Sequence, residues 1–190
     1  MIRARAAANI LLLGLAALAA AGCASDEDLV EVLLTAQCSG VSARVWMPVN
    51  EPRSIGTYRA EIVWQDGTRC SFSGAREGML SNVWLADLCG DGAPELVVTC
   101  ASAGSGSYGT VDVYRHDSGG MVQVDVAPLD VERATGYMGH DSFFIDGGRL
   151  YRSYPVYADG DKNAEPTGGE SALWYSFADS TWVHATAEPD

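Results

Sequence analysis

The stretch Pro94–Arg115, "PELVVTCASAGSGSYGTVDVYR", places a loop of small residues between two apolar runs. The runs 94–100 and 110–115 are rich in Val and Thr, which favour extended backbone, so each predicts a strand. Between them, Ser102–Gly109 contains only small uncharged residues and one tyrosine. This loop is either a plain hairpin connection or a loop shaped to enter a partner.

Strand-like segments continue on both sides of this stretch. They are separated by turn signals such as Asp66-Gly67 and Gly147-Gly148. Segment 29–38 fits a strand or a short helix, and only 129–138 hints at helix. Many short strands without an alternation of strands and helices predict an all-β fold, a single antiparallel domain of the sandwich or barrel type with Gly-rich loops.

The N-terminus has the features of a secretory signal. Two arginines in "MIRAR" precede an uncharged apolar run that ends in "LAAAGC". This ending is similar to a bacterial lipobox, with Ala20 where leucine is commonest, and it makes Cys23 the lipid-bearing residue. We therefore expect a signal peptide at 1–22, a lipid-anchored tether at 23–35 and the folded domain at 36–190. An ordinary signal peptide with a nearby cut is the alternative.

The resemblance to sorted lipoproteins also gives a location. Ala24, rather than Asp, follows Cys23, which favours the outer membrane. The apolar run is short for a membrane span, so the lipid is expected to be the only membrane attachment, facing the periplasm.

The chain is strongly acidic. Its formal net charge is −13, and removal of residues 1–22 takes away two arginines and no acid, giving −15. Nucleic-acid binding needs Lys and Arg on the protein surface, so that function class is excluded. The acidity favours a cationic partner or simply gives solubility.

Four cysteines remain once Cys23 is set aside. An even number in an oxidising compartment predicts two disulfides, with the pairing left open. The four are Cys38, Cys70, Cys89 and Cys100.

No stretch of the sequence has the motif of a catalytic site, a cofactor site or a strong metal site. None of the serines has the spacing of a nucleophile elbow, and no nucleotide-binding loop is present. Asp87, Asp91 and Glu95 are weak calcium candidates, because Cys89 stands where a further Asp would be needed. The sequence thus predicts a protein that is not an enzyme and carries no cofactor.

Four stretches in this order, behind a signal peptide, resemble the bacterial periplasmic inhibitors of I-type (invertebrate) lysozyme. The departures are Cys89 in the acidic turn, the extra cysteines and the segment before residue 50. The stretches are "NEPRSIGTY" (50–58), "LADLCGDGAPELVVTCASAGSGSYG" (85–109), "GYMGHDSFF" (136–144) and "SYPVYADGDKNAEPTGG" (153–169).

The resemblance implies a β-sandwich-like fold, often paired as a homodimer, whose Ser/Gly/Tyr loop enters the lysozyme cleft to protect peptidoglycan. The matching residues here are Ser105, Gly106, Ser107 and Tyr108. Hydroxyl groups suit a cleft with one protonated and one ionised carboxyl, because they donate to one and accept from the other.

Four further residues are second candidates for the interface or its support. They are Arg53, Tyr58, His140 and Asp141, of which the last two are expected to hold a neighbouring loop in place.

Three other functions stay open at this point. One is a calcium-assisted surface or adhesion module built on 87–95. Another is an immunity protein against a bacterial wall hydrolase. A wall-active glycosidase ranks last, since no motif frames its two carboxylates.

Overall fold

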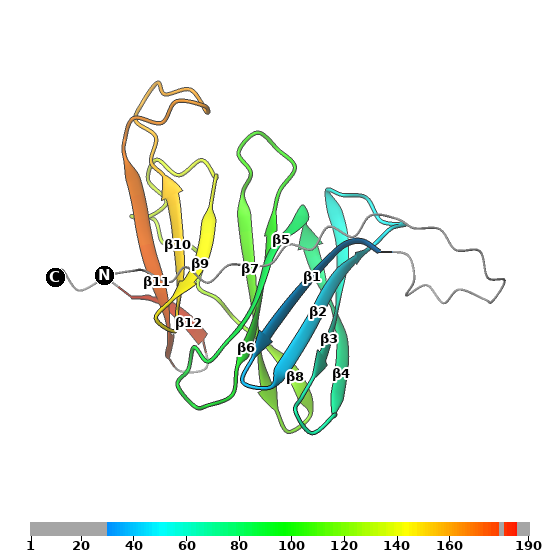
Figure 1. Ribbon diagram of the computed structural model, residues 1–190. Helices are drawn as coiled ribbons and strands as arrows, with labels where there is room; N and C mark the ends of the chain where they lie inside the picture. Colours follow the sequence, from blue (N-terminus) through cyan, green and yellow to red (C-terminus); the bar gives the residue numbers. More distant parts are fainter. Residues whose placement is uncertain (1–29, 179–180, 186–190) are drawn as a thin grey trace, which may run out of the picture.

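Three antiparallel sheets of four strands build the part of the chain that the structure, a computed structural model, describes: residues 30–178 and 181–185 (Figure 1). No helix occurs in these residues, which confirms the predicted all-β class. It follows that none of them forms a helix able to cross a membrane.

Each sheet is made of four strands that are consecutive in the chain. Sheet A has the order β1-β2-β3-β4, with bounds Val30–Cys38, Val41–Pro48, Ile55–Val63 and Arg69–Glu77. Sheet B has the order β5-β6-β7-β8, with bounds Met79–Ala86, Glu95–Ala101, Gly109–Asp117 and Gly120–Val124. Sheet C has the order β12-β11-β10-β9, with β9 at Ser142–Asp146, β10 at Arg149–Pro155, β11 at Glu170–Ala178 and β12 at Thr181–Ala185.

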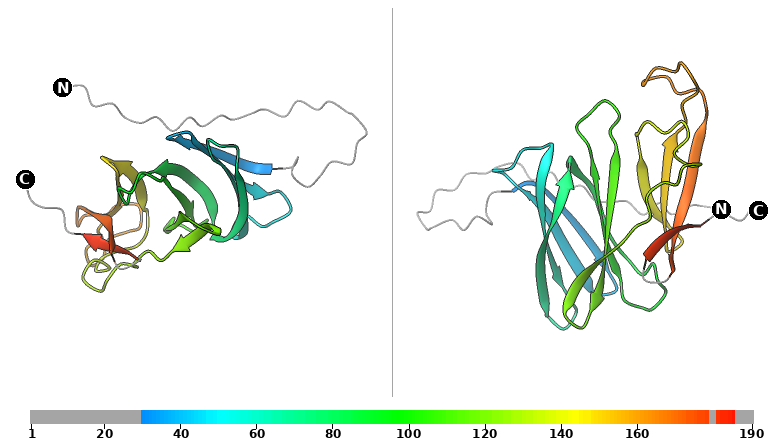
Figure 2. Two further views of the ribbon diagram at one scale, coloured as in Figure 1. Left: turned by 90° about the horizontal axis from the view of Figure 1, so that it is seen from below. Right: turned by 180° about the vertical axis from the view of Figure 1, so that it is seen from behind.

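Sheet B lies between the other two sheets, as Figures 1 and 2 both show. Its strand β6 is buried on both faces, because successive side chains of a strand point to opposite sides. Leu96 and Val98 pack toward sheet A, whereas Val97 packs toward sheet C. The unbroken apolar run of β6 is typical of such a doubly covered strand.

Two hydrophobic cores therefore hold the fold together. The first core lies between sheets A and B and includes Val45, Met47, Ile62, Leu85 and Leu96. The second core lies between sheets B and C and includes Val97, Leu150, Tyr154, Leu173 and Trp182.

The predicted hairpins are confirmed, and the helix hint is wrong. Strands β3 and β4 pair around the Asp66-Gly67 turn, and β9 and β10 pair around Gly147-Gly148. Segment 29–38 is strand from Val30 onward. Residues 131–136 form only turns, and the last of them, Gly136, has a φ of +71°, which a helix does not allow.

The expected leader and tether fall mostly outside the described residues. Residues 1–29, and with them Cys23, lie there, while residues 30–35 of the expected tether already belong to β1.

The predicted disulfides are absent from the described structure, and this prediction is wrong. All four cysteines are free thiols. Cys100 lies in the first core, whereas Cys89 packs against the second, on the other side of sheet B. Cys38 and Cys70 lie on β1 and β4, the opposite edges of sheet A. An even count of cysteines does not by itself bring two sulfur atoms together.

Candidate functional site

The β6–β7 loop, residues 102–108, projects at one end of the molecule, beside the loop between β10 and β11 (Figure 1). Its two ends are joined by hydrogen bonds. The Ser102 N–H donates to the Tyr108 carbonyl at 2.9 Å, and the Tyr108 N–H donates to Ser102 Oγ at 2.9 Å. The Ser107 N–H donates to the Gly104 carbonyl at 3.0 Å. These bonds define one conformation of the loop.

The four residues that the resemblance singled out occupy different positions in this loop. Ser105 is exposed, Ser107 is half-buried, and Tyr108 keeps 47% of its surface accessible. Gly106 is buried, and a Cβ added there would lie 2.6 Å from the Tyr108 ring and 2.8 Å from the Met138 carbonyl. The loop thus offers hydroxyl groups outward while its glycine permits close packing behind them.

A second segment, residues 137–141, supports the loop from behind. The His140 N–H donates to the Gly106 carbonyl at 2.6 Å, and the Asp141 carboxylate accepts the Gly109 N–H at 2.7 Å. The sequence predicts that His140 and Asp141 hold a neighbouring loop in place. In the structure, both residues accept or donate hydrogen bonds at the β6–β7 loop or at Gly109, where it ends. His140 uses its backbone for this contact, while its side chain is exposed.

Two residues at the site adopt a backbone conformation that is uncommon for residues other than glycine. Ser107 has a φ of +43° and His140 a φ of +61°. Such conformations persist where the surroundings fix them, and they cluster at binding sites.

Asp141 belongs to a buried polar group that we call the support cluster: Tyr137, Asp141 and Arg152. The Arg152 Nε donates to Asp141 Oδ1 at 2.7 Å, and the Tyr137 hydroxyl donates to Asp141 Oδ2 at 2.5 Å. Arg152 Nη2 donates to the Tyr137 hydroxyl at 2.9 Å. Burial, together with the hydrogen bond to Asp141, raises the pKa of Tyr137 above its ordinary value.

The β10–β11 loop contacts the tip of the site. Asn163 Nδ2 donates to the Ser105 carbonyl at 2.6 Å, and the Tyr157 hydroxyl donates to the Asn163 carbonyl at 2.8 Å. Two separate segments of the chain, residues 137–141 and the β10–β11 loop, therefore contact the β6–β7 loop or its end at Gly109.

Tyr58 and Arg53, two of the second candidates, differ in their exposure to solvent. Tyr58 is fully buried in the first core, where its hydroxyl bonds to Asp112 and Tyr114 at 2.6 Å each, so it is not available to a partner. This is a correction: Tyr58 follows the strand alternation of β3 and points inward with Ala60. Arg53 is exposed and pairs with Glu31 at 2.5 Å.

The "NEPRSIGTY" stretch is organised by Arg76, whose side chain is completely buried. Arg76 donates to the carbonyls of Pro52, Arg53, Thr57 and Gly78 at 2.7–3.1 Å. Gly78 in turn packs against the Ala101 carbonyl at the base of the β6–β7 loop. A Cβ added at Gly78 would lie 2.0 Å from that carbonyl oxygen. The stretch thus has a structural role beside the loop.

The three weak calcium candidates are engaged with the turn that carries them. Asp87 accepts the backbone N–H groups of residues 90–92, and buried Glu95 accepts that of Leu88 at 2.8 Å. Asp91 lies 3.6 Å from an Arg115 nitrogen. Among the described residues no group of three acidic, His or Cys side chains has the arrangement of a metal site.

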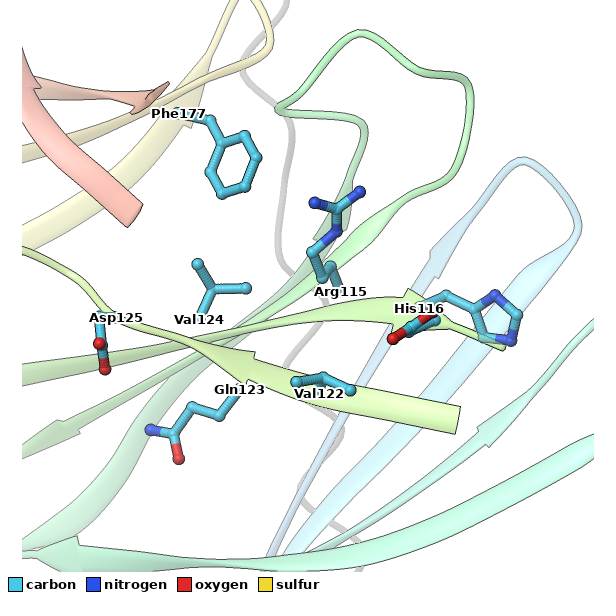
Figure 3. Close-up of a pocket in the computed structure, with 8 residues that line it drawn as sticks. Arg115, His116, Val122, Gln123, Val124, Asp125 and Phe177 are labelled. Carbon is cyan, nitrogen blue, oxygen red and sulfur yellow. The ribbon is translucent and has the colours of Figure 1, made fainter. Parts of the chain in front are cut away.

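A separate pocket of about 420 Å³ lies where β7 and β8 face Phe177, at the opposite end of β7 from the loop. Figure 3 shows the Arg115 guanidinium turned toward the Phe177 ring, 5.1 Å from its centroid. His116 turns away and packs against Trp64, with ring centroids 4.8 Å apart. The pocket is lined by an arginine, a histidine, two aspartates, a glutamine, two valines and a phenylalanine. Its histidine is therefore not paired with a nucleophile that it could activate.

Sequence reasoning missed Tyr137, Arg152 and Asn163. Two of them lie inside stretches that carried the resemblance, 136–144 and 153–169, but neither stretch identifies a contact to the loop. Arg152 precedes the second stretch by one residue, and only its place on β10 brings it to Asp141.

The comparisons with known proteins bear on this same region. The family described as "Periplasmic lysozyme inhibitor of I-type lysozyme" (PliI) matches residues 35–130, which include the whole β6–β7 loop. This range begins before the stretch 50–58 and ends before 136–144. No curated protein matches the chain.

Two solved structures are similar in sequence to about half of this chain. PliI of Aeromonas hydrophila in complex with Meretrix lusoria lysozyme is 31% identical, over 46% of this chain and 76% of that one, with a TM-score of 0.41. The structure of PliI-Ah from the same organism is 30% identical, over 46% of this chain and 79% of that one, with a TM-score of 0.40.

Sheet B, the exposed Ser/Gly/Tyr loop and all of sheet A except the first residues of β1 lie within the residues that the family matches. The loop is the feature that the resemblance had singled out, and the family is one of inhibitory binding proteins, not enzymes. The chain belongs to the family of periplasmic inhibitors of I-type lysozyme.

Proposed function

We propose that this chain inhibits an I-type lysozyme by inserting the β6–β7 loop into the active-site cleft of the enzyme. The observation that carries the proposal is the loop itself, which projects from the fold, exposes Ser105 and Tyr108, and is held in one conformation by its own hydrogen bonds. A relative, PliI of Aeromonas hydrophila, has been crystallised with a lysozyme.

The chemistry of the loop suits a glycosidase cleft. Such a cleft has two carboxyl groups, one of which must be protonated for catalysis. A carboxylate entering it would be repelled, whereas a hydroxyl can donate to the ionised group or accept from the protonated one. Each hydrogen bond to a charged group contributes about 1.5–3 kcal/mol, so Ser105 and Tyr108 together would anchor the complex.

The tyrosine ring adds apolar contact. Tyr108 lies edge-on to Tyr137, with ring centroids 5.6 Å apart and planes at 76°, which leaves nearly half of its surface accessible. A partly packed ring keeps its orientation before binding, and less entropy is lost when it enters the cleft.

We further infer that the protein acts in the periplasm, attached to the outer membrane through lipid on Cys23. The family description and the sequence of the leader support this inference, and residue 23 lies outside the described residues. Pairing into a homodimer is part of the same proposal and rests on the family resemblance. Both are checked by membrane fractionation with Cys23→Ser as control, and by sedimentation of residues 24–190.

The experiment is an inhibition assay with purified residues 24–190. We expect the protein to abolish lysis of a bacterial suspension by an invertebrate lysozyme, and the double variant Ser105→Ala, Tyr108→Ala to lose most of this effect. Phe144→Ala is the matched control, because Phe144 is also an exposed aromatic residue but lies on β9. A panel with chicken-type and goose-type lysozymes tests selectivity. Full inhibition by the double variant would overturn the loop assignment.

A further inference from the structure

The β6–β7 loop is held at its base by side chains that follow the family-matched residues 35–130 in the chain. The support cluster contributes Asp141, which leads into β9, and Arg152 on β10, while the loop connects two strands of sheet B. Sheet C is therefore joined to sheet B through the second core, and the support cluster adds a specific polar contact to Gly109, where the loop ends.

The support cluster is a closed set of charge-assisted hydrogen bonds. Asp141 Oδ2 accepts both the Gly109 N–H at 2.7 Å and the Tyr137 hydroxyl at 2.5 Å, while Oδ1 accepts Arg152 Nε at 2.7 Å. The Asp141 carboxylate is completely buried and the Arg152 side chain nearly so. A buried carboxylate with these partners has little freedom to move, because losing any one of them leaves a polar group unpaired.

Aromatic rings also surround the Arg152 guanidinium of the support cluster. The Arg152 guanidinium lies within 5.3–5.8 Å of the ring centroids of Tyr137, Phe143 and Tyr154. Gly109 packs tightly in the same place, since a Cβ added there would lie 2.6 Å from Asp141 Cβ and 2.8 Å from the Phe143 ring. Tyr137 also supports the face of the loop through its edge contact with Tyr108.

We propose that Asp141, Arg152 and Tyr137 are positioning residues for inhibition: they fix the start of β7 at Gly109, and so set the direction in which Tyr108 and Ser105 are presented. This rests on the proposed function of the loop. Asp141 contacts Gly109, Tyr137 contacts Tyr108, and Arg152 holds both of them, so their effect on affinity passes through the order of the loop before binding.

The test combines an inhibition assay with amide hydrogen exchange on full-length mature protein. Asp141→Asn keeps the size of the side chain but removes its charge and one acceptor oxygen. We expect the Gly109 amide to exchange at least about tenfold faster and the inhibition constant to rise about tenfold, with a cooperative thermal transition retained. Tyr137→Phe removes one hydroxyl and should increase the Gly109 exchange rate and the inhibition constant by smaller factors. This variant tests the proposal if Asp141→Asn does not fold.

Asp112→Asn is the matched control. Asp112 also accepts a tyrosine hydroxyl in a partly buried position, at 2.6 Å from Tyr58, but it lies in the middle of β7 facing the first core. It should leave the Gly109 exchange rate and the inhibition constant unchanged. An equal loss of inhibition in Asp112→Asn would show that general destabilisation is responsible, and would overturn the proposal.

A double-mutant cycle separates positioning from other effects. If the support cluster acts through the loop, Asp141→Asn should weaken inhibition less in the Tyr108→Ala variant than in wild type, because one of the two presented side chains is already absent. Additive losses would contradict the proposal. If the wild-type protein does not inhibit the lysozyme at all, the proposed function fails, and the exchange rate of Gly109 still decides whether the cluster orders the loop.

Discussion

At the scale of single residues, the hydroxyl of Tyr108 is the group that the proposed function uses most directly. We expect Tyr108→Phe to weaken inhibition about ten- to a hundredfold, because one hydrogen bond to a charged carboxyl is lost while the ring remains. The melting temperature should not change, since the side chain is 47% exposed. Titration of enzyme activity and a thermal melt measure the two quantities; a variant that inhibits like wild type would show that the hydroxyl makes no such bond.

Arg76 is the residue whose loss should cost the fold most near the site. Arg76→Met removes the donors for four carbonyl groups, two in the β2–β3 loop, one at Thr57 on β3 and one at Gly78, and we expect the free energy of unfolding to fall by about 3 kcal/mol. Arg69→Met on the same strand is the control, because its side chain is 64% exposed, and it should change stability by less than about 0.5 kcal/mol. Urea unfolding measures both variants; equal midpoints would contradict the role assigned to Arg76.

At the scale of elements, strand β6 and the turn before it contain two thiols that the fold protects. Burial raises the pKa of Cys89 and of Cys100 to about 12. Because the thiolate is the reactive form, each should be alkylated about a thousandfold more slowly at pH 8 than a thiol with an ordinary pKa of about 8.5.

Peptide mapping by mass spectrometry after alkylation of the native and the urea-unfolded chain measures these rates. The unfolded chain is the control, and all four cysteines of the mature domain should react there without prior reduction. Labelling of Cys100 at the same rate in both states would contradict its burial, and a requirement for reduction would reveal a disulfide.

The strands and hairpins were the part of the fold that the sequence predicted most directly. Alternation along β3 and the turn residues Asp66-Gly67 and Gly147-Gly148 are local signals, and each produced the expected hairpin. The same alternation also places Tyr58 on the inward face with Ala60 and Ile62, although Tyr58 had been a second candidate for the interface.

Long-range contacts could not be predicted in this way. The support cluster joins Asp141 to Gly109, 32 positions earlier in the chain, and to Arg152 on another strand. Its members become neighbours only when sheet C packs on sheet B, and no local pattern specifies that packing. The disulfide prediction failed for the same reason, because a count of cysteines contains no distances.

At the scale of the whole molecule, the described residues form three layers, and the family-matched residues account for sheet B and for all of sheet A except the start of β1. Sheet C and the segments that flank it supply the contacts behind the β6–β7 loop. A rigid scaffold that presents one exposed loop is a common arrangement for binding proteins, because the scaffold reduces the entropy lost on binding. The negative net charge, −13 for the full chain and −15 without residues 1–22, would attract a partner of positive charge.

The most direct measurement is a crystal structure of the mature protein bound to an I-type lysozyme. The account predicts that the β6–β7 loop lies in the substrate cleft, with the hydroxyl groups of Ser105 and Tyr108 within hydrogen-bonding distance of the two catalytic carboxyl groups. A complex in which this loop faces solvent, while another surface binds the enzyme, would contradict it.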